Sequence, residues 1–405
     1  MTFNKILDKL ILLSILAVFV TSTFMPSDVI GYAALVTVFL SILRRRRLVF
    51  GAAELWLLAY FMIVVISLAG SSLFALSLKG FLKTVIYLAF YISIVPYIKD
   101  NKDKIPLIFG TMAVCVAFEG IVGFLQNFAQ VGEISTWQDV SSLNPEDVMT
   151  RVYGTLKPYN PNLLGGYLAA CLPCLFGMSA YFGFLRKFKT AAIWLAGALF
   201  TSGILFATGC RGAYLAFMVI IACIALLGAR YKKIYLAFAG GAVMLMSAAV
   251  LSISSLRARI LSMFAMRQDS SNSFRFNVYH SSFEMFRDNW LLGIGVGNKN
   301  FREIYGLYMK TGFDALSAYN IFLEIAVESG IFALIAFLGF LATLVRKAIF
   351  FIKHSADIKN VIFVSAALTS IFAVMAHGLV DTVFFRPQIQ FIFWTMTAVI
   401  SASDA

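Results

Sequence analysis

The sequence predicts an all-α protein that crosses a membrane many times, and three observations lead to that class. Of its 405 residues, 60% are hydrophobic and only 13% are charged, whereas about 25% of the residues in a soluble domain are charged. The apolar residues gather in runs of roughly 20, the length that a helix needs to cross the hydrocarbon core. The basic residues lie in short clusters between these runs, a pattern typical of cytoplasmic loops. The net charge of +13 therefore does not predict a nucleic-acid partner.

The apolar runs predict about twelve membrane spans. The first run, near Leu10 to Phe24, lacks a small-residue cleavage site and is followed by more spans, so we expect a span rather than a cleaved signal peptide. The expected spans centre near Leu16, Val36, Met62, Tyr87, Ala117, Leu172, Leu199, Met218, Val243, Leu334, Ser370 and Trp394.

The basic clusters all fall on one side of this arrangement. They are Lys5 and Lys9 before the first span, Arg44 to Arg47, Lys99 to Lys104, Arg186 to Lys189, Arg230 to Lys233 and Arg346 to Lys359, each later one after an even-numbered span. The positive-inside rule then predicts an inner (plasma) membrane protein with both termini in the cytoplasm. Two longer and more polar segments, residues 130–160 and 254–317, fall on the external side. A single membrane domain, 1–405, with two external loops is the simplest partition.

We expect neither a metal site nor a cofactor. The five cysteines lie in or at the ends of apolar runs, and Cys171 and Cys174 form a CxxC pair. No second pair and no nearby histidine completes a set of metal ligands. The cysteines are therefore expected to pack as small residues inside helices.

A few arginines fall on the external side, where positive charge is usually sparse. Arg211 lies at the tight joint between the seventh and eighth spans, among small residues that let a ligand approach the backbone. Arg275 lies in the second external segment. A guanidinium can hold a phosphate in two-point geometry, so the two arginines predict a site for an anionic, lipid-linked substrate. An interfacial anchor is the alternative role for Arg211.

The second external segment predicts an amphipathic helix on or under the outer membrane surface. Its aromatic residues recur at spacings of three and four; they are Phe276, Tyr279, Phe283, Phe286 and Trp290. Arg275 and Arg287 project from its other faces, and a solvated charged face is the alternative role for Arg287. The glycine-rich stretch Leu292 to Asn298 has no βαβ unit around it. We expect it to form a turn between two loop helices rather than a nucleotide loop.

Polar residues also follow helical spacing in the tenth span. Asn320, Glu324 and Glu328 lie at i, i+4 and i+8 and share one helix face. Carboxylates inside a membrane usually line a cavity or pair with cations. Glu324 and Glu328 are therefore candidate partners of the arginines or candidate general bases, with a structural ion pair as the alternative.

The eleventh span ends with a second polar group. His377 and Asp381 lie at i and i+4, and Arg386 follows them. A histidine that is oriented by a carboxylate is a candidate general base, although a packing role is the alternative. In the first external loop, Arg151 and Asn162 precede the sixth span and form either a second cationic edge to the site or a plain loop entry.

Three stretches together resemble the O-antigen ligase and polymerase superfamily. They are R-x-x-G-T-x…N-P-N from Arg151 to Asn162, Arg211-Gly212-Ala213, and D-N-W-L-L-G-I-G-V-G-N…A-Y-N…E-x-G between Arg275 and Gly330. The resemblance covers roughly residues 150–340. Residues 316–320 and 377–388 are more specifically similar to the IctB subgroup, cyanobacterial-type proteins labelled as inorganic-carbon transporters.

The resemblance implies a metal-independent membrane glycosyltransferase of the GT-C type. Such an enzyme transfers a glycan from undecaprenyl diphosphate to a glycan or lipid acceptor at the periplasmic face, with membrane lipids around it and no nucleic acid. It implies that Arg211 and Arg275 bind the diphosphate. The family's catalytic histidine falls on Tyr319, and tyrosine, with a pKa near 10, is a poor base at neutral pH. His377 or Glu328 would then serve as the base.

These considerations define one set of candidate residues and three candidate functions. The catalytic candidates are Arg211, Arg275, Tyr319, His377 and Glu328. The substrate-binding candidates are Arg151, Asn162, Arg287, Asn320, Glu324, Asp381 and Arg386. Glycosyl transfer comes first. An inorganic-carbon (bicarbonate) transporter or transport accessory comes second, because it needs a continuous polar path through the spans. A non-catalytic lipid- or glycan-binding protein comes third.

Overall fold

The computed structural model describes residues 3–128, 151–229, 240–241, 244, 252–261 and 270–404. Within these ranges the regular elements are α-helices and two short 3-10 helices, and there is no strand. The prediction of an all-α polytopic membrane protein is confirmed. Most of the first expected external loop, residues 130–150, and part of the second, residues 262–269, lie outside the described ranges.

Nine of the described helices are long and apolar enough to cross a membrane. They are α1 (Phe3–Phe24), α3 (Ala52–Gly70), α4 (Phe74–Asp100), α5 (Ile105–Phe128), α6 (Pro161–Phe184), α7 (Phe188–Ala207), α8 (Arg211–Ala229), α13 (Ile321–His354) and α14 (Ile358–His377). The shorter helices α2 (Ser27–Arg44) and α15 (Pro387–Ser401) coincide with the second and twelfth expected spans. The ninth expected span, near Val243, lies outside the described residues.

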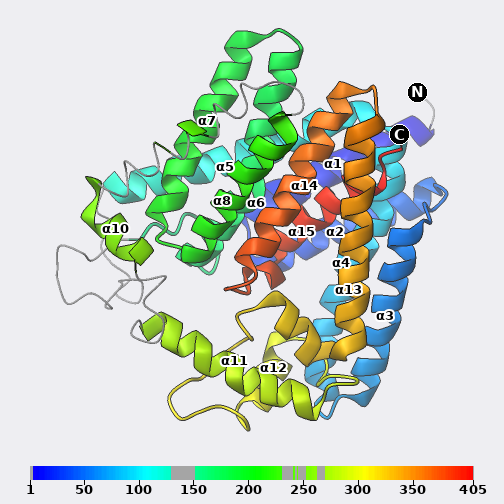
Figure 1. The fold of residues 1–405 in the computed structure, drawn as a ribbon. Coiled ribbons are helices and arrows are strands. Elements are labelled where there is room, and N and C mark those ends of the chain that lie inside the picture. The colour runs from blue at the N-terminus through cyan, green and yellow to red at the C-terminus, as the bar shows by residue number, and fades with distance from the viewer. Residues whose placement is uncertain are drawn as a thin grey trace.

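Helix α6 forms the centre of the bundle. In its most apolar stretch of 18 residues, 83% of the residues are buried. Helices α5, α7, α8 and α14 pack against it (Figure 1). Gly165 and Gly166 near its start permit this close packing, because a side chain added at either position would meet its neighbours at less than 3.0 Å. The cysteines of the CxxC pair, Cys171 and Cys174, are fully buried here and unpaired, as expected.

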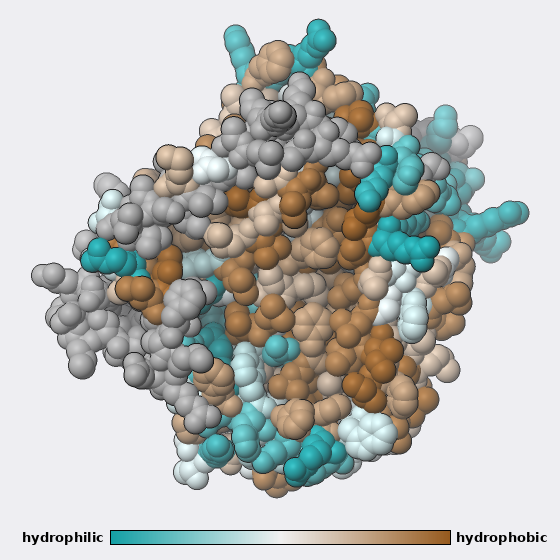
Figure 2. Space-filling view, in the orientation of Figure 1, coloured by the Kyte–Doolittle hydropathy of each residue, from teal (hydrophilic) through white to brown (hydrophobic). Residues whose placement is uncertain are grey.

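The basic clusters that the structure describes meet at one end of the bundle. Asp8 accepts hydrogen bonds from Arg44 and Arg46, and Arg46 also pairs with Asp100. At the chain end, Lys99 pairs with Asp404 at 2.8 Å. Both termini lie at this end in Figure 1. Figure 2 shows apolar residues across the middle of one face and hydrophilic residues towards its margins, the distribution that a lipid-facing belt requires.

The opposite end carries a small helical layer formed by α11 (Ser270–Asp288) and α12 (Asn298–Tyr305) (Figure 1). Helix α11 confirms the predicted loop helix. The layer has a small apolar core of its own, separate from that of the bundle. The fully buried members of this core include Val278, Met285, Phe301, Tyr305 and Val327. Phe276, Phe283 and Trp290 stay exposed, so the predicted aromatic face is only partly buried. A further short helix, α10 (Ser254–Leu261), precedes this layer.

The glycine-rich stretch forms the turn between α11 and α12, as the sequence predicts. Gly293, Gly295 and Gly297 have φ values of 69°, 95° and 118°, which favour glycine. The turn lies against α13, where the amides of Ile294 and Gly295 donate to the carbonyls of Val327 and Glu328 at 3.0 and 2.9 Å. A side chain at Gly293 would lie 2.4 Å from that backbone. The turn therefore fixes the layer of α11 and α12 to the membrane bundle.

Candidate functional site

Asp381 lies at the centre of the polar contacts at the end of the bundle that carries α11 and α12. The residue is buried, and it follows the last turn of α14. Its Oδ2 accepts a hydrogen bond from Asn162 Nδ2 at 2.9 Å and lies 3.9 Å from Arg275 Nη2. Its Oδ1 accepts from the backbone amide of Thr382 at 2.7 Å. Asp381 thus joins the start of α6, the end of α14 and helix α11.

Arg151 joins the same group through Asn162. Its Nη2 donates to Asn162 Oδ1, and its Nε donates to the carbonyl of Thr208, at the end of α7, at 2.8 Å. Asn160 caps α6 by accepting from the amide of Asn162 at 2.7 Å, and Pro161 occupies the first turn, where no amide is needed. The loop entry at Arg151 is therefore ordered by the helix that it precedes.

Two side chains of α5 hold the Arg151 segment against the bundle. Glu119 is fully buried and accepts from both the amide and the hydroxyl of Thr155. Gln126 accepts from the amides of Tyr153 and Gly154 at 3.1 and 2.9 Å. These contacts satisfy backbone groups that would otherwise be costly to bury.

Helix α11 brings the two arginines of the diphosphate hypothesis to one region. Arg211, the first residue of α8, is 6% exposed, and its Nη1 donates to Asn272 Oδ1 at 3.0 Å. Asn272 and Arg275 are three residues apart on α11 and so share one face. One turn of α11 therefore contacts Arg211 through Asn272 and Asp381 through Arg275.

His377 is enclosed between α6 and α8. It is 2% exposed. A side chain added at Gly166 would lie 2.9 Å from its ring, and one added at Gly212 would lie 2.2 Å from its Cδ2 atom. Its Nε2 lies 3.4 Å from the Sγ atom of Cys210. The ring therefore fills a slot that only glycine leaves open on either side.

Tyr319 lies beside the end of α14 with a left-handed backbone, at φ 51°. Its carbonyl accepts from the hydroxyl of Tyr279 at 3.2 Å, and its ring packs edge-on against Phe274. Burial, and then the negative charge of Asp381, raises the pKa of the Tyr319 hydroxyl above its ordinary value. The Tyr319 hydroxyl therefore stays protonated at neutral pH and does not act as a general base there.

The side chains of Asn320, Glu324 and Glu328 form hydrogen bonds with backbone groups of neighbouring segments. Asn320 caps α13, accepting from the amides of Phe322 and Leu323, and its Nδ2 donates to the carbonyl of Leu379 at 3.0 Å. Glu324 accepts from the amide of Ala318 at 3.2 Å, and Glu328 accepts from the amide of Gly297 at 2.7 Å. The two carboxylates thus anchor the loops on either side of α12.

The remaining candidates lie at the margin of the group. Arg287 is exposed and its Nε lies 3.6 Å from its neighbour Asp288. Arg386 is also exposed and begins α15 as its N-cap, close enough for its charge to act on Tyr319 and Glu324.

Three residues of the group were not predicted from the sequence. Cys210 contacts His377, Asn272 contacts Arg211, and Glu119 holds the Arg151 segment. Glu119 carried a usable signal, because a carboxylate in the middle of an apolar span rarely lacks a partner. Cys210 and Asn272 carried none, since both are ordinary residues whose partners lie far away in the chain.

Residues 196–338 match the family model for O-antigen ligase. The matched range runs from α7 into α13 and includes Arg211, Arg275 and Tyr319. The match supports the O-antigen ligase superfamily, and with it a multi-pass membrane glycosyltransferase of the O-antigen ligase and polymerase type. The family implies lipid-linked glycan substrates and a membrane environment. No curated protein matches the chain.

Proposed function

We propose that this protein transfers a glycan from undecaprenyl diphosphate to a glycan or lipid acceptor at the external face of the inner membrane. The observation that carries the proposal is the group of cationic side chains around Asp381. Arg275 approaches Asp381 directly, Arg151 reaches it through Asn162, and Arg211 is tied to the same turn of α11. Three guanidiniums thus gather near one buried carboxylate, and guanidiniums suit the oxygens of an anionic ligand.

The end of the bundle that carries this group also supports the proposal. The described basic clusters meet at the other end, and the positive-inside rule assigns that end to the cytoplasm. The arginines then face the compartment in which lipid-linked glycans are transferred in this superfamily. Guanidiniums match phosphate oxygens two at a time, so they suit a diphosphate better than lysines would.

The reaction follows from this arrangement. An acceptor hydroxyl attacks the anomeric carbon, forming a new C–O bond while the bond from that carbon to the diphosphate oxygen breaks. The hydroxyl proton passes to a base, and undecaprenyl diphosphate leaves with the bonding pair. Arg211 and Arg275 stabilise the charge that grows on the diphosphate, an effect that is strongest where water is scarce.

We assign the base to Asp381 in preference to the other candidates. A general base must reach the hydroxyl whose proton it takes. The ring of His377 is enclosed by Gly166, Gly212 and Cys210, and Glu328 contacts the turn at Gly297 rather than an arginine of the group. Asp381 carries a carboxylate beside Arg275, where the leaving group would bind. His377 then acts as a positioning residue for the end of α14.

The test is glycan transfer by purified protein in liposomes that contain a synthetic polyprenyl-diphosphate glycan. Asp381→Asn keeps the size of the side chain and removes its charge, so we expect transfer to fall by about 10²–10⁴-fold. His377→Ala should lower transfer without changing the shape of the pH profile. Arg287→Ala, an exposed arginine at the margin, is the control and should transfer normally.

Two outcomes would contradict the proposal. One is full transfer by Asp381→Asn, which would remove Asp381 from the reaction. The other is a wild-type protein that neither binds nor uses a polyprenyl diphosphate but conducts bicarbonate into liposomes. Such flux, abolished by Arg211→Ala, would favour the transporter.

A further inference from the structure

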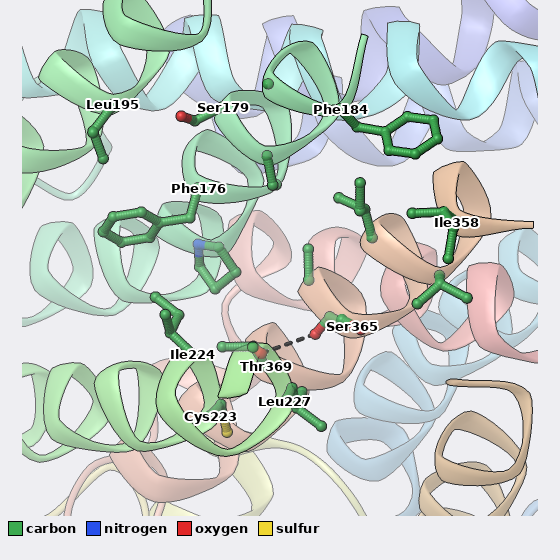
Figure 3. Close-up of a pocket in the computed structure, with 18 of the residues that line it drawn as sticks. Phe176, Ser179, Phe184, Leu195, Cys223, Ile224, Leu227, Ile358, Ser365 and Thr369 are labelled. Atoms are coloured by element: carbon green, nitrogen blue, oxygen red, sulfur yellow. Dashed lines mark hydrogen bonds between the residues drawn. The ribbon is translucent and has the colours of Figure 1, made fainter. Parts of the chain in front are cut away.

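A cavity of about 630 Å³ lies among α6, α7, α8 and α14, away from the arginine group (Figure 3). Most of the side chains that line it are apolar, including Phe176, Leu195, Ile224 and Leu227. Its volume is within the range of about 300–1,000 Å³ that is usual for small-molecule sites. The cavity therefore has room for an apolar ligand between membrane helices.

Two hydroxyls in the cavity are turned towards helix backbone. The hydroxyl of Ser179 donates to the carbonyl of Ala191 at 2.9 Å. The hydroxyl of Thr369 donates to the carbonyl of Ser365 at 2.8 Å, as Figure 3 shows. Among the described residues that line the cavity there is no lysine, arginine, aspartate or glutamate. The lining thus suits a hydrocarbon chain.

The cavity reaches the end of the bundle where the basic clusters lie. Phe184, the last residue of α6, and Ile358, the first residue of α14, both line it and lie on one side of it in Figure 3. Asn162 lies near the other end of α6, 11 residues before Pro173, the first described residue of α6 that lines the cavity, which corresponds to roughly 16 Å along a helix. The cavity is therefore distinct from the arginine group.

Cations lie within five residues after each of these two residues in the chain. They are Arg186, Lys187 and Lys189 after Phe184, and Lys359 after Ile358, and all four are exposed. The acidic residue nearest in the chain, Asp357, caps α14 and accepts from the amide and side chain of Asn360. At this end of the cavity an apolar interior is therefore followed in the chain by four exposed cations.

We propose that this cavity binds a membrane phospholipid with an anionic headgroup. One acyl chain fills the cavity between α6, α7, α8 and α14. Lys187, Lys189 and Lys359 contact the headgroup phosphate, whose negative charge is not offset by a choline or ethanolamine cation in an anionic lipid. Basic residues near an anionic leaflet each strengthen binding by about fivefold, so these lysines select anionic over zwitterionic lipid.

The experiment is native mass spectrometry of the full-length protein, released from nanodiscs that contain equal amounts of phosphatidylglycerol and phosphatidylcholine. The wild-type protein should retain one phospholipid and favour phosphatidylglycerol. Ser365→Phe, which fills the cavity, should abolish retention. Its matched control, Ala192→Phe, adds the same ring at an exposed position of α7 that does not line the cavity, and should retain the lipid.

The headgroup preference has its own matched pair. The double variant Lys187→Gln/Lys189→Gln should lose about 25-fold in preference for phosphatidylglycerol, fivefold for each charge. The control Arg45→Gln/Arg47→Gln removes two exposed charges from another cluster at the same end and should keep the preference. Thermal unfolding of each variant shows that the fold is retained.

Three results would overturn the proposal. They are equal retention of phosphatidylcholine by the wild-type protein, continued retention by a folded Ser365→Phe variant, and displacement of phosphatidylglycerol by polyprenyl phosphate. Failure of this site leaves the proposed glycosyl transfer untouched, because that activity is measured separately at the other end of α6.

Discussion

Asn162 and Asp381 are hydrogen-bonded at 2.9 Å although 219 residues separate them in the chain. The first opens α6, and the second follows α14, so the contact closes the bundle at the end where the arginines lie. The side-chain amide of Asn162 also accepts a hydrogen bond from Arg151, so it links Asp381 to Arg151.

Membrane orientation can be tested with single cysteines. All five native cysteines are buried, so background labelling should be low. Leu307→Cys lies after α12 at a position where the native side chain is 84% exposed, and an impermeant maleimide should label it in intact cells. Arg47→Cys, at the basic end, should be labelled only after the membrane is permeabilised. The reverse pattern would put the arginine group in the cytoplasm and rule out the proposed donor.

Arg211 should not tolerate lysine. Arg211→Lys keeps the charge but loses the two-point geometry of the guanidinium, and its shorter reach to Asn272 weakens the tie to α11. We expect kcat for glycan transfer to fall by about 10²–10³-fold in both Arg211→Lys and Arg211→Ala. Arg287→Ala provides the control. Near-normal transfer by the lysine variant would mean that Arg211 contributes charge alone.

Tyr319→His restores the residue that the superfamily pattern has at this position. Histidine tolerates the left-handed backbone found here, at φ 51°. Transfer should be preserved or raised. Because only neutral imidazole accepts a proton, any gain should disappear as the pH falls below about 6.5. Tyr319→Phe should transfer like the wild type, since burial raises the pKa of the Tyr319 hydroxyl and keeps it protonated. Inactivity of Tyr319→Phe would show that the hydroxyl takes part.

Gly212→Ala should destabilise the bundle. The added methyl group would lie 2.2 Å from His377 Cδ2, and overpacking of this kind costs about 1–3 kcal/mol. The melting temperature in detergent should fall. Adding His377→Ala should recover part of the loss, because the two changes share one space and are therefore not additive. Additive losses would show that the methyl group and the ring do not compete. Gly203→Ala, with nothing within 4 Å, is the matched control.

The sequence by itself determined the helices and their order. In a bilayer every backbone amide and carbonyl must be paired within the protein, so an apolar run of sufficient length becomes a helix wherever it occurs. Residue spacing and residue type within short segments also predicted α11, from its aromatic residues, and the turn at Gly293 to Gly297, from its glycines. The sequence also identified the arginines that lie apart from the basic clusters, Arg211 and Arg275 among them.

Only the tertiary structure decided which of those residues meet. Glu324 and Glu328 share a helix face with Asn320, yet their carboxylates bind loop amides rather than the arginines. His377 lies one turn before Asp381 in the sequence, but its ring faces Cys210 between two glycines. Asp381 instead meets Asn162 and Arg275. Spacing in the sequence fixes the helix face on which a side chain lies. Its partner depends on how helices that are distant in the chain pack together, and that packing is set by the fit of side chains throughout the bundle.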